Sequence, residues 1–333
     1  MRKLFARAAM LAVIAIAATP TQAQQVIKVA TFVPAKSVGV AKVIKPWLEA
    51  VQKEVGGEVK LQGYWGGTLG KNPRKQYELL RNGVSDVSWV LPGYTAGQFP
   101  QMGIFELPFL FDTAIEASVV GWKLHEKGLL KGLDEVHVVG FFAAEPNLIF
   151  MKSKIDSLDD LKNKKIRSAG AIHAYWLQKF GASPQTMTAT ELNEALNRGT
   201  LDGVIQGWTG MQTFKTLPLV EQAYSVPTGT IPFLLLMNQK TWKGLSKKVQ
   251  AAVMKHGGLA MAKAGGNGYK GVSDDILAKE LKSGRITMSK PGAERMRAFA
   301  ERSRQVHNWW IDKTEGGRAV YAAVQAELKV MRK

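Results

Sequence analysis

Short apolar stretches and longer amphipathic segments follow one another in turn along the chain. Residues 26–33, 59–64 and 84–91 are rich in β-branched residues of alternating polarity, which predicts strands. Residues 38–55 and 73–82 place apolar residues at helical spacing instead, which predicts amphipathic helices. Because strands and helices alternate, we expect an α/β fold in which a parallel sheet is covered by helices on both faces.

The pattern begins again in the second half of the chain, after a predicted helix at 114–127 and a predicted strand at 136–142. Residues 78–86 read ELLRNGVSD and residues 194–202 read EALNRGTLD, so they share Glu, Leu, Gly and Asp at matching positions. Each segment reads as a helix end, a glycine suited to a left-handed cap and the entry to a strand, although unrelated corners share this turn chemistry. We expect two α/β lobes of similar architecture with a ligand cleft between them.

The chain changes character after residue 230 and becomes mostly helical. Residues 246–281 predict a helix long enough to cross between the lobes, and its glycine pairs at 257–258 and 265–266 are either bends or helix boundaries. The other elements expected here are strands at 231–237 and 285–288 and helices at 291–313 and 317–331.

The N-terminus has the parts of a secretory signal peptide. Arg2, Lys3 and Arg7 precede the apolar run 8–18, and we expect cleavage after Ala23. No later stretch approaches about 18 uncharged apolar residues, so we expect a soluble, periplasmic mature protein. The chain contains no cysteine, which excludes disulfides and thiolate metal sites.

The charge balance points to an anionic partner without naming it. The 333 residues carry a formal net charge of +18, and removing the three basic residues of the signal peptide leaves 18 − 3 = +15. Such a balance attracts anions over long range. The basic residues are spread through every segment and are not gathered around aromatic residues, so with the export signal they argue against a nucleic-acid partner.

Arg167 is the residue whose position best explains an anionic ligand. It lies in 166–170, a predicted strand that runs into a small-residue turn, and 171–181 reads as the helix that follows. Side chains at the carboxyl end of such a strand face the crevice where open α/β sheets bind ligands. A guanidinium remains charged and offers a planar fork of donors that fits a carboxylate. We interpret Arg167 as the cation that holds a small organic acid; the alternative is a surface arginine at a strand end.

The sequence offers little support for catalysis. Its histidines lack the spacing of HExxH, and the chain has neither a GxSxG elbow nor a phosphate-binding P-loop. We therefore expect a binding protein, not an enzyme, without a metal or a cofactor. Two alternatives stay open: a periplasmic lyase or hydrolase on the same two lobes, and a receptor that presents its ligand to a sensor protein.

Several motifs together resemble one protein family over nearly the whole mature chain. They are LG at 69–70, GVSD at 83–86, FELPF at 105–109, IDSLDDLKNKKIR at 155–167 and ALNRGTLDG at 195–203. This combination is similar to the extracytoplasmic solute receptors of tripartite ATP-independent periplasmic (TRAP) transporters, of the dicarboxylate-receptor (DctP) type. The resemblance implies a two-lobed fold like that of periplasmic binding proteins. A hinge would close the lobes on a small organic acid, which is then delivered to a TRAP membrane permease.

The same resemblance implies where each lobe begins and ends. Lobe I is expected to comprise residues 24–146 and 232–272, and lobe II residues 147–231 and 273–333. The lobe on which the C-terminal helices pack is left open.

This chain also departs from the family pattern in ways that bear on the ligand. The family's carboxylate-binding arginine ends the KIR motif and corresponds to Arg167, but some members have a second arginine where this chain has Asn147. Many members have a glutamate where this chain has Ile205, which argues against a metal that bridges the ligand. With one arginine and with Trp208 nearby, the predicted ligand is a monocarboxylate with an apolar or aromatic body; a four-carbon dicarboxylate is the next hypothesis.

The other ligand-binding candidates are polar or aromatic residues at strand ends, loops and lobe crossings. Gln206 matches the family's pocket amide, and Trp208 offers a wall for an apolar ligand body. Asn147 and Asn238 lie where the chain is expected to cross between lobes, and either could cap a turn instead. The first-lobe candidates are Phe32, Trp65, Trp89 and Tyr94.

Overall fold

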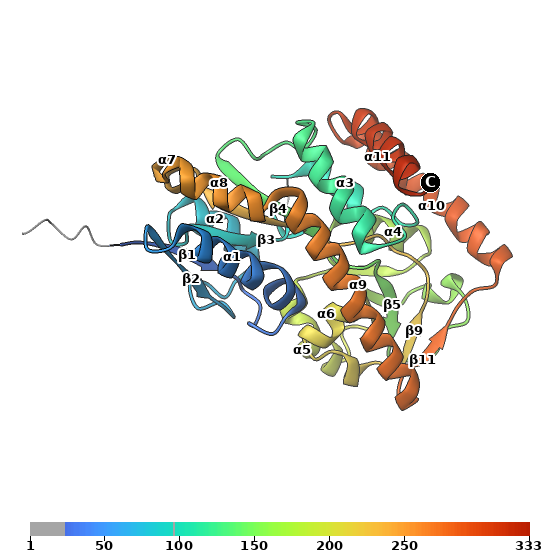
Figure 1. Ribbon diagram of the computed structural model, residues 1–333. Coiled ribbons are helices and arrows are strands. Elements are labelled where there is room, and N and C mark those ends of the chain that lie inside the picture. Colours follow the sequence, from blue (N-terminus) through green and yellow to red (C-terminus); the bar gives the residue numbers. More distant parts are fainter. Residues whose placement is uncertain (1–23, 96) are drawn as a thin grey trace, which may run out of the picture.

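The computed structural model describes residues 24–95 and 97–333, so the predicted signal peptide lies outside the described residues. Figure 1 shows two sheets flanked by helices, with the helix α9 (Gly258–Ser283) running from one to the other. We call the half built on the first sheet the first lobe and the half built on the second sheet the second lobe. The predicted two-lobed α/β fold with a long inter-lobe helix is confirmed.

The first lobe contains a five-stranded sheet in the order β2-β1-β3-β10-β4. Its apolar core includes Ile27, Val29 and Leu235, each no more than 1% exposed. The strands are β1 (Gln25–Ala30), β2 (Val59–Tyr64), β3 (Val87–Val90), β4 (Val136–Ala143) and β10 (Pro232–Asn238). The helices are α1 (Lys45–Val55), which follows a π-helical turn, α2 (Gln76–Arg81), α3 (Ala114–Glu126), α7 (Gln239–Gly244) and α8 (Lys247–His256).

The second lobe contains a six-stranded sheet in the order β11-β9-β5-β8-β6-β7. Its core includes Phe150, Leu192 and Val204, which are fully buried. The strands are β5 (Leu148–Met151), β6 (Lys165–Ser168), β7 (Ser183–Thr186), β8 (Gly203–Gln206), β9 (Gln222–Tyr224) and β11 (Thr287–Ser289). The helices are α4 (Ala171–Lys179), α5 (Leu192–Asn197) and α6 (Trp208–Thr213).

The prediction of a purely parallel sheet is wrong for one strand in each lobe. β10 runs antiparallel to β3 and β4, and β5 runs antiparallel to β8 and β9. Both reversed strands come directly after the chain has crossed from the other lobe, through residues 144–147 and 225–231. A chain that enters a lobe at the cleft has to run away from it, whereas the neighbouring strands end at the cleft. The reversal therefore follows from the crossing.

The two repeated corners adopt the same local structure. Gly83 and Gly199 both have a left-handed backbone, with φ of 71° and 70°. The Asp86 carboxylate accepts a hydrogen bond of 2.8 Å from the Lys28 amide in β1, and the Asp202 carboxylate accepts one of 2.7 Å from the Lys165 amide in β6. Each aspartate thus joins the strand that follows the corner to a neighbouring strand, which explains why both positions carry one.

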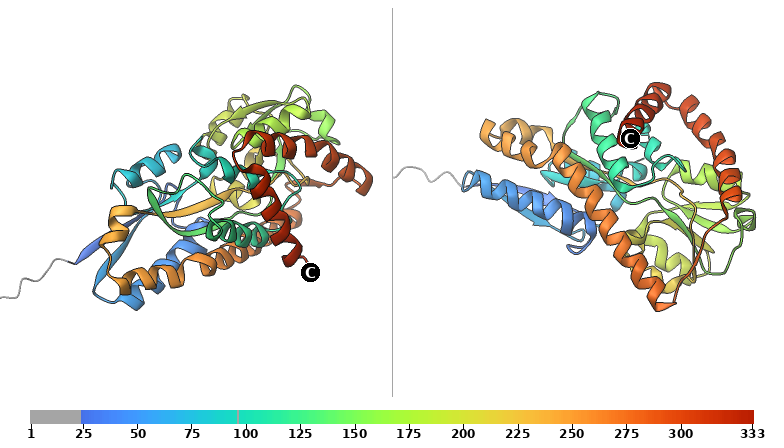
Figure 2. Two further views of the ribbon diagram at one scale, coloured as in Figure 1. Left: turned by 90° about the horizontal axis from the view of Figure 1, so that it is seen from above. Right: turned by 45° about the vertical axis from the view of Figure 1, so that its right-hand side comes forward.

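Of the two glycine pairs in the predicted long helix, only the first is a boundary. α8 ends at His256, and α9 begins at Gly258. Gly265 and Gly266 lie inside α9, where a Cβ atom would come within 2.4 Å of Phe142 Cβ and 2.6 Å of Ile115 Cα. These glycines let α9 approach β4 and α3 closely. The orange helix α9 then continues to the second sheet (Figure 2), where Ile276 joins the core around Phe150.

The two C-terminal helices, α10 (Ala293–Lys313) and α11 (Gly317–Met331), pack on different lobes. α10 lies on α4, where Trp176 Nε1 donates a 2.8 Å hydrogen bond to Ser303 Oγ. α11 lies on α3, where Lys123 and Glu327 form a 2.6 Å ion pair. Within residues 24–95 and 97–333, no helix combines the length and apolar character needed to cross a bilayer.

Candidate ligand-binding site

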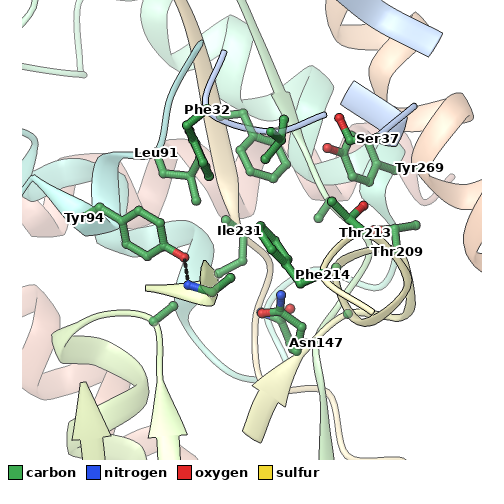
Figure 3. A pocket seen from close by; sticks show the side chains of 18 of the residues that line it. Phe32, Ser37, Leu91, Tyr94, Asn147, Thr209, Thr213, Phe214, Ile231 and Tyr269 are labelled. Atoms are coloured by element: carbon green, nitrogen blue, oxygen red, sulfur yellow. Dashed lines mark hydrogen bonds between the residues drawn. The ribbon is translucent and has the colours of Figure 1, made fainter. Parts of the chain in front are cut away.

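A cavity of about 60 Å³ lies where the strand ends of the two lobes meet. The first lobe supplies Phe32, Ser37, Leu91 and Tyr94, and Figure 3 shows these side chains around the cavity with Asn147. A cavity that holds a benzene ring measures about 150 Å³. Admission of a ring-sized ligand therefore requires the lobes to move apart or lining side chains to turn. Of the predicted binding residues, those that line it are Phe32, Trp89, Tyr94, Asn147, Arg167 and Gln206.

Arg167 stands at the carboxyl end of β6 and is only 1% exposed. Its Nε donates to the Met187 carbonyl at 3.0 Å, and its Nη1 donates to the Ile205 carbonyl at 3.0 Å. Nη1 also donates to Gln206 Oε1 at 2.9 Å, and Nη2 donates to the Tyr94 hydroxyl at 3.0 Å. These bonds fix the plane of the guanidinium. Since a guanidinium has five N–H groups, one on Nη2 is left for a ligand.

All of these partners are neutral, so the charge of Arg167 is not balanced at close range. Among the described residues, no carboxylate lies within 4.0 Å of its nitrogens. Moving an unpaired ion from water into the protein interior costs roughly several kcal/mol of free energy. An anion that enters the cavity would remove this cost. The alternative of a surface arginine is wrong, because the Arg167 side chain is buried.

Tyr94 connects the two lobes through its hydroxyl group. Besides the bond from Arg167, its oxygen accepts a 2.9 Å hydrogen bond from the Ala189 amide. Figure 3 shows the Tyr94 hydroxyl with a dashed bond at this junction. Because both lone pairs are occupied, the O–H proton is left to donate to another acceptor. Tyr94 lines the cavity, so a ligand oxygen can be that acceptor.

Several buried polar side-chain atoms of residues that line the cavity have no partner among the described residues. Asn147 is 1% exposed, and neither the oxygen nor the nitrogen of its side-chain amide makes a hydrogen bond within this part of the chain. Trp89 Nε1 and Ser37 Oγ are also buried without a partner. Buried polar groups are nearly always hydrogen-bonded in native proteins, so these atoms mark places where a ligand or water completes the site.

The remaining walls of the cavity are apolar and aromatic. Trp89 packs on Phe32 with ring centroids 6.1 Å apart and on Phe233 at 4.9 Å. Phe214 and Ile231 add apolar surface. The arrangement therefore offers a cation at one side and a hydrophobic enclosure around the rest, which suits an acid with an apolar body.

Glu145 and Tyr269 support the cavity from the crossing segment and from α9. The Glu145 carboxylate accepts from the Thr209 amide at 2.8 Å and from its hydroxyl at 2.9 Å, and so ties residues 144–147 to α6. Burial raises the pKa of Glu145 to about 7. Burial also raises the pKa of the Tyr269 phenol well above its ordinary value, so this lining hydroxyl stays protonated.

The structure places three predicted binding residues outside the cavity. Trp208 packs edge-on against Phe150, 4.8 Å between centroids, in the core of the second lobe. Trp65 covers Gly63 in the first lobe. Asn238 lies at the far end of β10, where its Oδ1 accepts from the amides of Lys240 and Thr241 and caps α7. Asn238 therefore caps a helix of the first lobe, and its predicted place at a crossing between the lobes is wrong.

Sequence reasoning missed several lining residues. Tyr269 lies in the middle of α9, and Phe214 lies just after α6, so neither stands at a predicted strand end. Ser37 precedes a helix and reads as a cap. No local signal separates these residues from structural ones, because their place at the cavity depends on how the lobes meet. In the described part of the chain, no group of three or more histidine, aspartate or glutamate residues could hold a metal ion.

The fold and the site together define a two-lobed solute-binding protein. Residues 29–313 match the family model described as bacterial extracellular solute-binding protein, family 7, named DctP. The chain belongs to this family, and the resemblance to TRAP solute receptors is confirmed.

Solved structures of similar proteins share the whole fold. A TRAP solute binding protein of an unidentified marine microbe, specific for aromatic acid ligands and in complex with metahydroxyphenylacetate, is 28% identical. It gives a TM-score of 0.87 over 93% of this chain and 100% of the other. A TRAP solute binding protein from Rhodoferax ferrireducens T118, in complex with copurified benzoate, is 25% identical with a TM-score of 0.84, over 91% and 97% of the two chains.

Curated relatives match over a shorter span. The protein named outer membrane transporter protein TsaT, from Comamonas testosteroni, is 27% identical over 227 residues, which is 66% of this chain and 67% of the relative. The match to a second relative, the uncharacterized protein YiiZ of Salmonella typhimurium, covers 64% of that protein. The chain thus matches about two thirds of the length of these two relatives.

Proposed function

We propose that this protein is a periplasmic receptor that captures a small monocarboxylate with an apolar or aromatic body and delivers it to a TRAP membrane permease. The observation that carries the proposal is Arg167, a buried guanidinium with only neutral partners that faces an apolar inter-lobe cavity. A carboxylate would supply the missing negative charge and accept from the free N–H of Nη2. Closure of the lobes would then exclude water from the pair.

A single negative group fits the site better than two. Arg167 is the only cationic side chain among the described residues that line the cavity. A second carboxylate would meet Asn147, whose amide can donate a hydrogen bond but carries no charge. Asn147 instead suits a neutral hydroxyl or carbonyl oxygen on the ligand body.

The aromatic walls support an apolar ligand body. Trp89, Phe32 and Phe214 line the cavity, and burying a ring against them removes apolar surface from water. The ligands of the two solved relatives, metahydroxyphenylacetate and benzoate, are acids of this kind.

A thermal-shift screen tests the proposal. Benzoate, 3-hydroxybenzoate and phenylacetate are expected to raise the melting temperature by several degrees, because ligand at 1,000 times Kd stabilises the folded state by about 4 kcal/mol. Benzamide has the same ring without the charge and serves as the matched control, with succinate as the dicarboxylate. Stabilisation by benzamide equal to that by benzoate, or by succinate alone, would contradict the proposal.

Asn147→Ala is expected to weaken binding of a hydroxylated aromatic acid by about 3- to 10-fold, the range for one or two hydrogen bonds. The free energy of unfolding without ligand should stay the same or rise, because the substitution removes two buried polar atoms that have no partner. Calorimetry and denaturant unfolding measure the two effects.

Asn238→Ala is the matched control for this prediction. It removes the cap of α7 and should lower stability by about 1 kcal/mol with unchanged affinity. A loss of unliganded stability in Asn147→Ala as large as that in Asn238→Ala would show that the Asn147 amide has a structural role instead.

Four further assignments belong to this proposal: the cleavage site, the bounds of each lobe and the absence of turnover. The signal peptide is cleaved after Ala23, lobe I comprises 24–146 and 232–272, and lobe II comprises 147–231 and 273–333. The observed contact of α11 with α3 favours moving that helix to lobe I. The receptor releases its ligand chemically unchanged. Mass spectrometry of the ligand after prolonged incubation with the protein tests this assignment.

A further inference from the structure

A second buried acid lies behind the carboxylate site. Glu106 ends the 3₁₀ segment Pro100–Glu106 and is 3% exposed. Its Oε2 has no hydrogen-bond partner in residues 24–95 and 97–333. The protein interior therefore holds a carboxyl group with one oxygen that lacks a hydrogen-bond partner among the described residues. Such a group is costly when it is ionised, and its charge depends on the charges nearby.

The Glu106 carboxyl group packs against Gly93 of the first lobe and Gly170 of the second lobe, which lack the Cβ atoms that would occupy its space. A Cβ atom on Gly93 would lie 2.6 Å from its Oε1, and a Cβ atom on Gly170 would lie 3.0 Å from its Oε2. Each glycine is next in sequence to a residue of the ligand cavity, Tyr94 and Ala169. Glu106 therefore lies against backbone that adjoins, in sequence, two residues of the cavity that Arg167 also lines.

The positive charge of Arg167 acts on the ionisation of Glu106. Burial raises the pKa of Glu106 to about 7, and the positive charge of Arg167 opposes that rise. Above this pH without ligand, an ionised Glu106 gives the buried pair a net charge of +1 − 1 = 0. A bound carboxylate would change the sum to +1 − 1 − 1 = −1, unless one proton restores it to zero.

We propose that Glu106 takes up one proton when a carboxylate binds at Arg167, so that capture of the anion is coupled to protonation of the receptor. The inference rests on the proposed function. The ligand anion and the Glu106 carboxylate share the field of a single cation, and the ligand lies on the side of Arg167 that faces the cavity. The proton comes from solvent, and no bond other than the new O–H of Glu106 forms.

The structure provides a route for that proton. Glu106 lines a second cavity of about 280 Å³, which is separate from the ligand cavity and reaches the end of α10 at Trp310, Lys313 and Thr314. The buried Trp310 Nε1 also lines this cavity without a partner, which suits ordered water there. Glu106 can therefore exchange a proton with solvent while the lobes are closed on the ligand.

The other titratable groups around Glu106 do not replace it as the proton acceptor. His173 on α4 lies 3.8 Å away, Nδ1 to Oε2, but burial and the Arg167 charge lower the pKa of His173 to about 3, so it stays neutral. Lys313 lines the second cavity and has an exposed side chain. Glu145 is the one other buried carboxyl near the ligand cavity, and its pKa is also raised to about 7, but it already accepts two hydrogen bonds from Thr209.

Calorimetry of benzoate binding at pH 8 in phosphate and in Tris tests the inference, because the two buffers differ in ionisation enthalpy. The wild-type protein is expected to take up about half a proton or more per benzoate, and its affinity should fall several-fold from pH 7 to pH 9. The affinity falls with rising pH because the pKa of Glu106 is expected to be higher with ligand than without. Protonation of Glu106 therefore favours the bound state, and this contribution to the affinity is lost as the pH rises.

Glu106→Gln is expected to abolish the proton uptake and the pH dependence and to bind benzoate at pH 8 at least as tightly as the wild type. A purely structural role would weaken binding at every pH instead. Glu106→Asp keeps a carboxyl group and should retain the uptake.

Two kinds of failure are distinguishable. Absence of monocarboxylate binding by the wild-type protein would overturn both the proposed function and this inference. Binding without proton uptake, or with uptake that persists in Glu106→Gln and so belongs to a group such as Glu145, overturns this inference alone.

Discussion

Arg167→Ala is expected to weaken carboxylate binding by about 30-fold or more, since loss of one partner of a desolvated charge pair costs roughly 2 to 5 kcal/mol. Micromolar binding corresponds to about 8 kcal/mol, so this one residue supplies a large share of the affinity. Arg167→Lys is expected to recover little of it. An ammonium cannot hold Met187, Ile205, Gln206 and Tyr94 in place as the planar guanidinium does.

Isothermal titration calorimetry with the tightest acid from the screen measures the effect. Arg198→Ala is the matched control, because Arg198 is an exposed arginine paired with Glu194 at 2.7 Å, and its loss should change affinity less than twofold. Near wild-type affinity in Arg167→Ala, in a protein whose circular dichroism is unchanged, would remove the basis of the proposed function.

Gly266→Ala is expected to lower the free energy of unfolding by about 1 to 3 kcal/mol, the usual cost of overpacking a well-packed site. The added Cβ would lie 2.6 Å from Ile115 Cα and 3.0 Å from Ile115 N, and backbone atoms cannot turn aside as a side chain can. The helix α9 would have to move away from α3. Urea unfolding without ligand measures the change.

Gly271→Ala provides a control of opposite sign on the same helix. Gly271 is exposed, and nothing lies within 4 Å of the Cβ it would gain, so alanine should stabilise the protein by roughly 0.5 to 1 kcal/mol through helix propensity alone. If both substitutions destabilised the protein, alanine would be unfavourable on α9 in general. The close packing of Gly266 on α3 would then not explain the effect of Gly266→Ala.

Local sequence patterns predicted much of the fold. β2 and α11 have the predicted bounds, because alternating apolar residues in 59–64 and helical spacing in 317–331 are strong signals. β7 and β9 were not predicted. β7 reads SPQT and is partly exposed, and β9 has three residues, so neither shows an apolar alternation. Pairing with neighbouring strands creates them, and pairing is not visible in a local pattern.

The sequence identifies the lining residues that stand at strand ends. It does not identify those that reach the cavity because of how the two lobes meet. Arg167 is the last residue but one of β6, Gln206 is the last residue of β8, and both line the cavity. Trp208 stands two residues beyond Gln206, but α6 begins there and turns its indole into the core. Tyr269 reaches the cavity from a helix more than 60 residues further along the chain. Only the tertiary arrangement distinguishes these two aromatic residues.

The packing of α10 and α11 limits how the receptor can move. The chain passes between the two sheets at 144–147, at 225–231 and along α9, and the turn from α10 to α11 adds a fourth connection at the outer side. Two lobes joined at four places are therefore expected to open by rotation about these connections and not by separation. A rotation of this kind would open the cavity at its inter-lobe edge while the four connections keep the strand ends of both lobes facing each other.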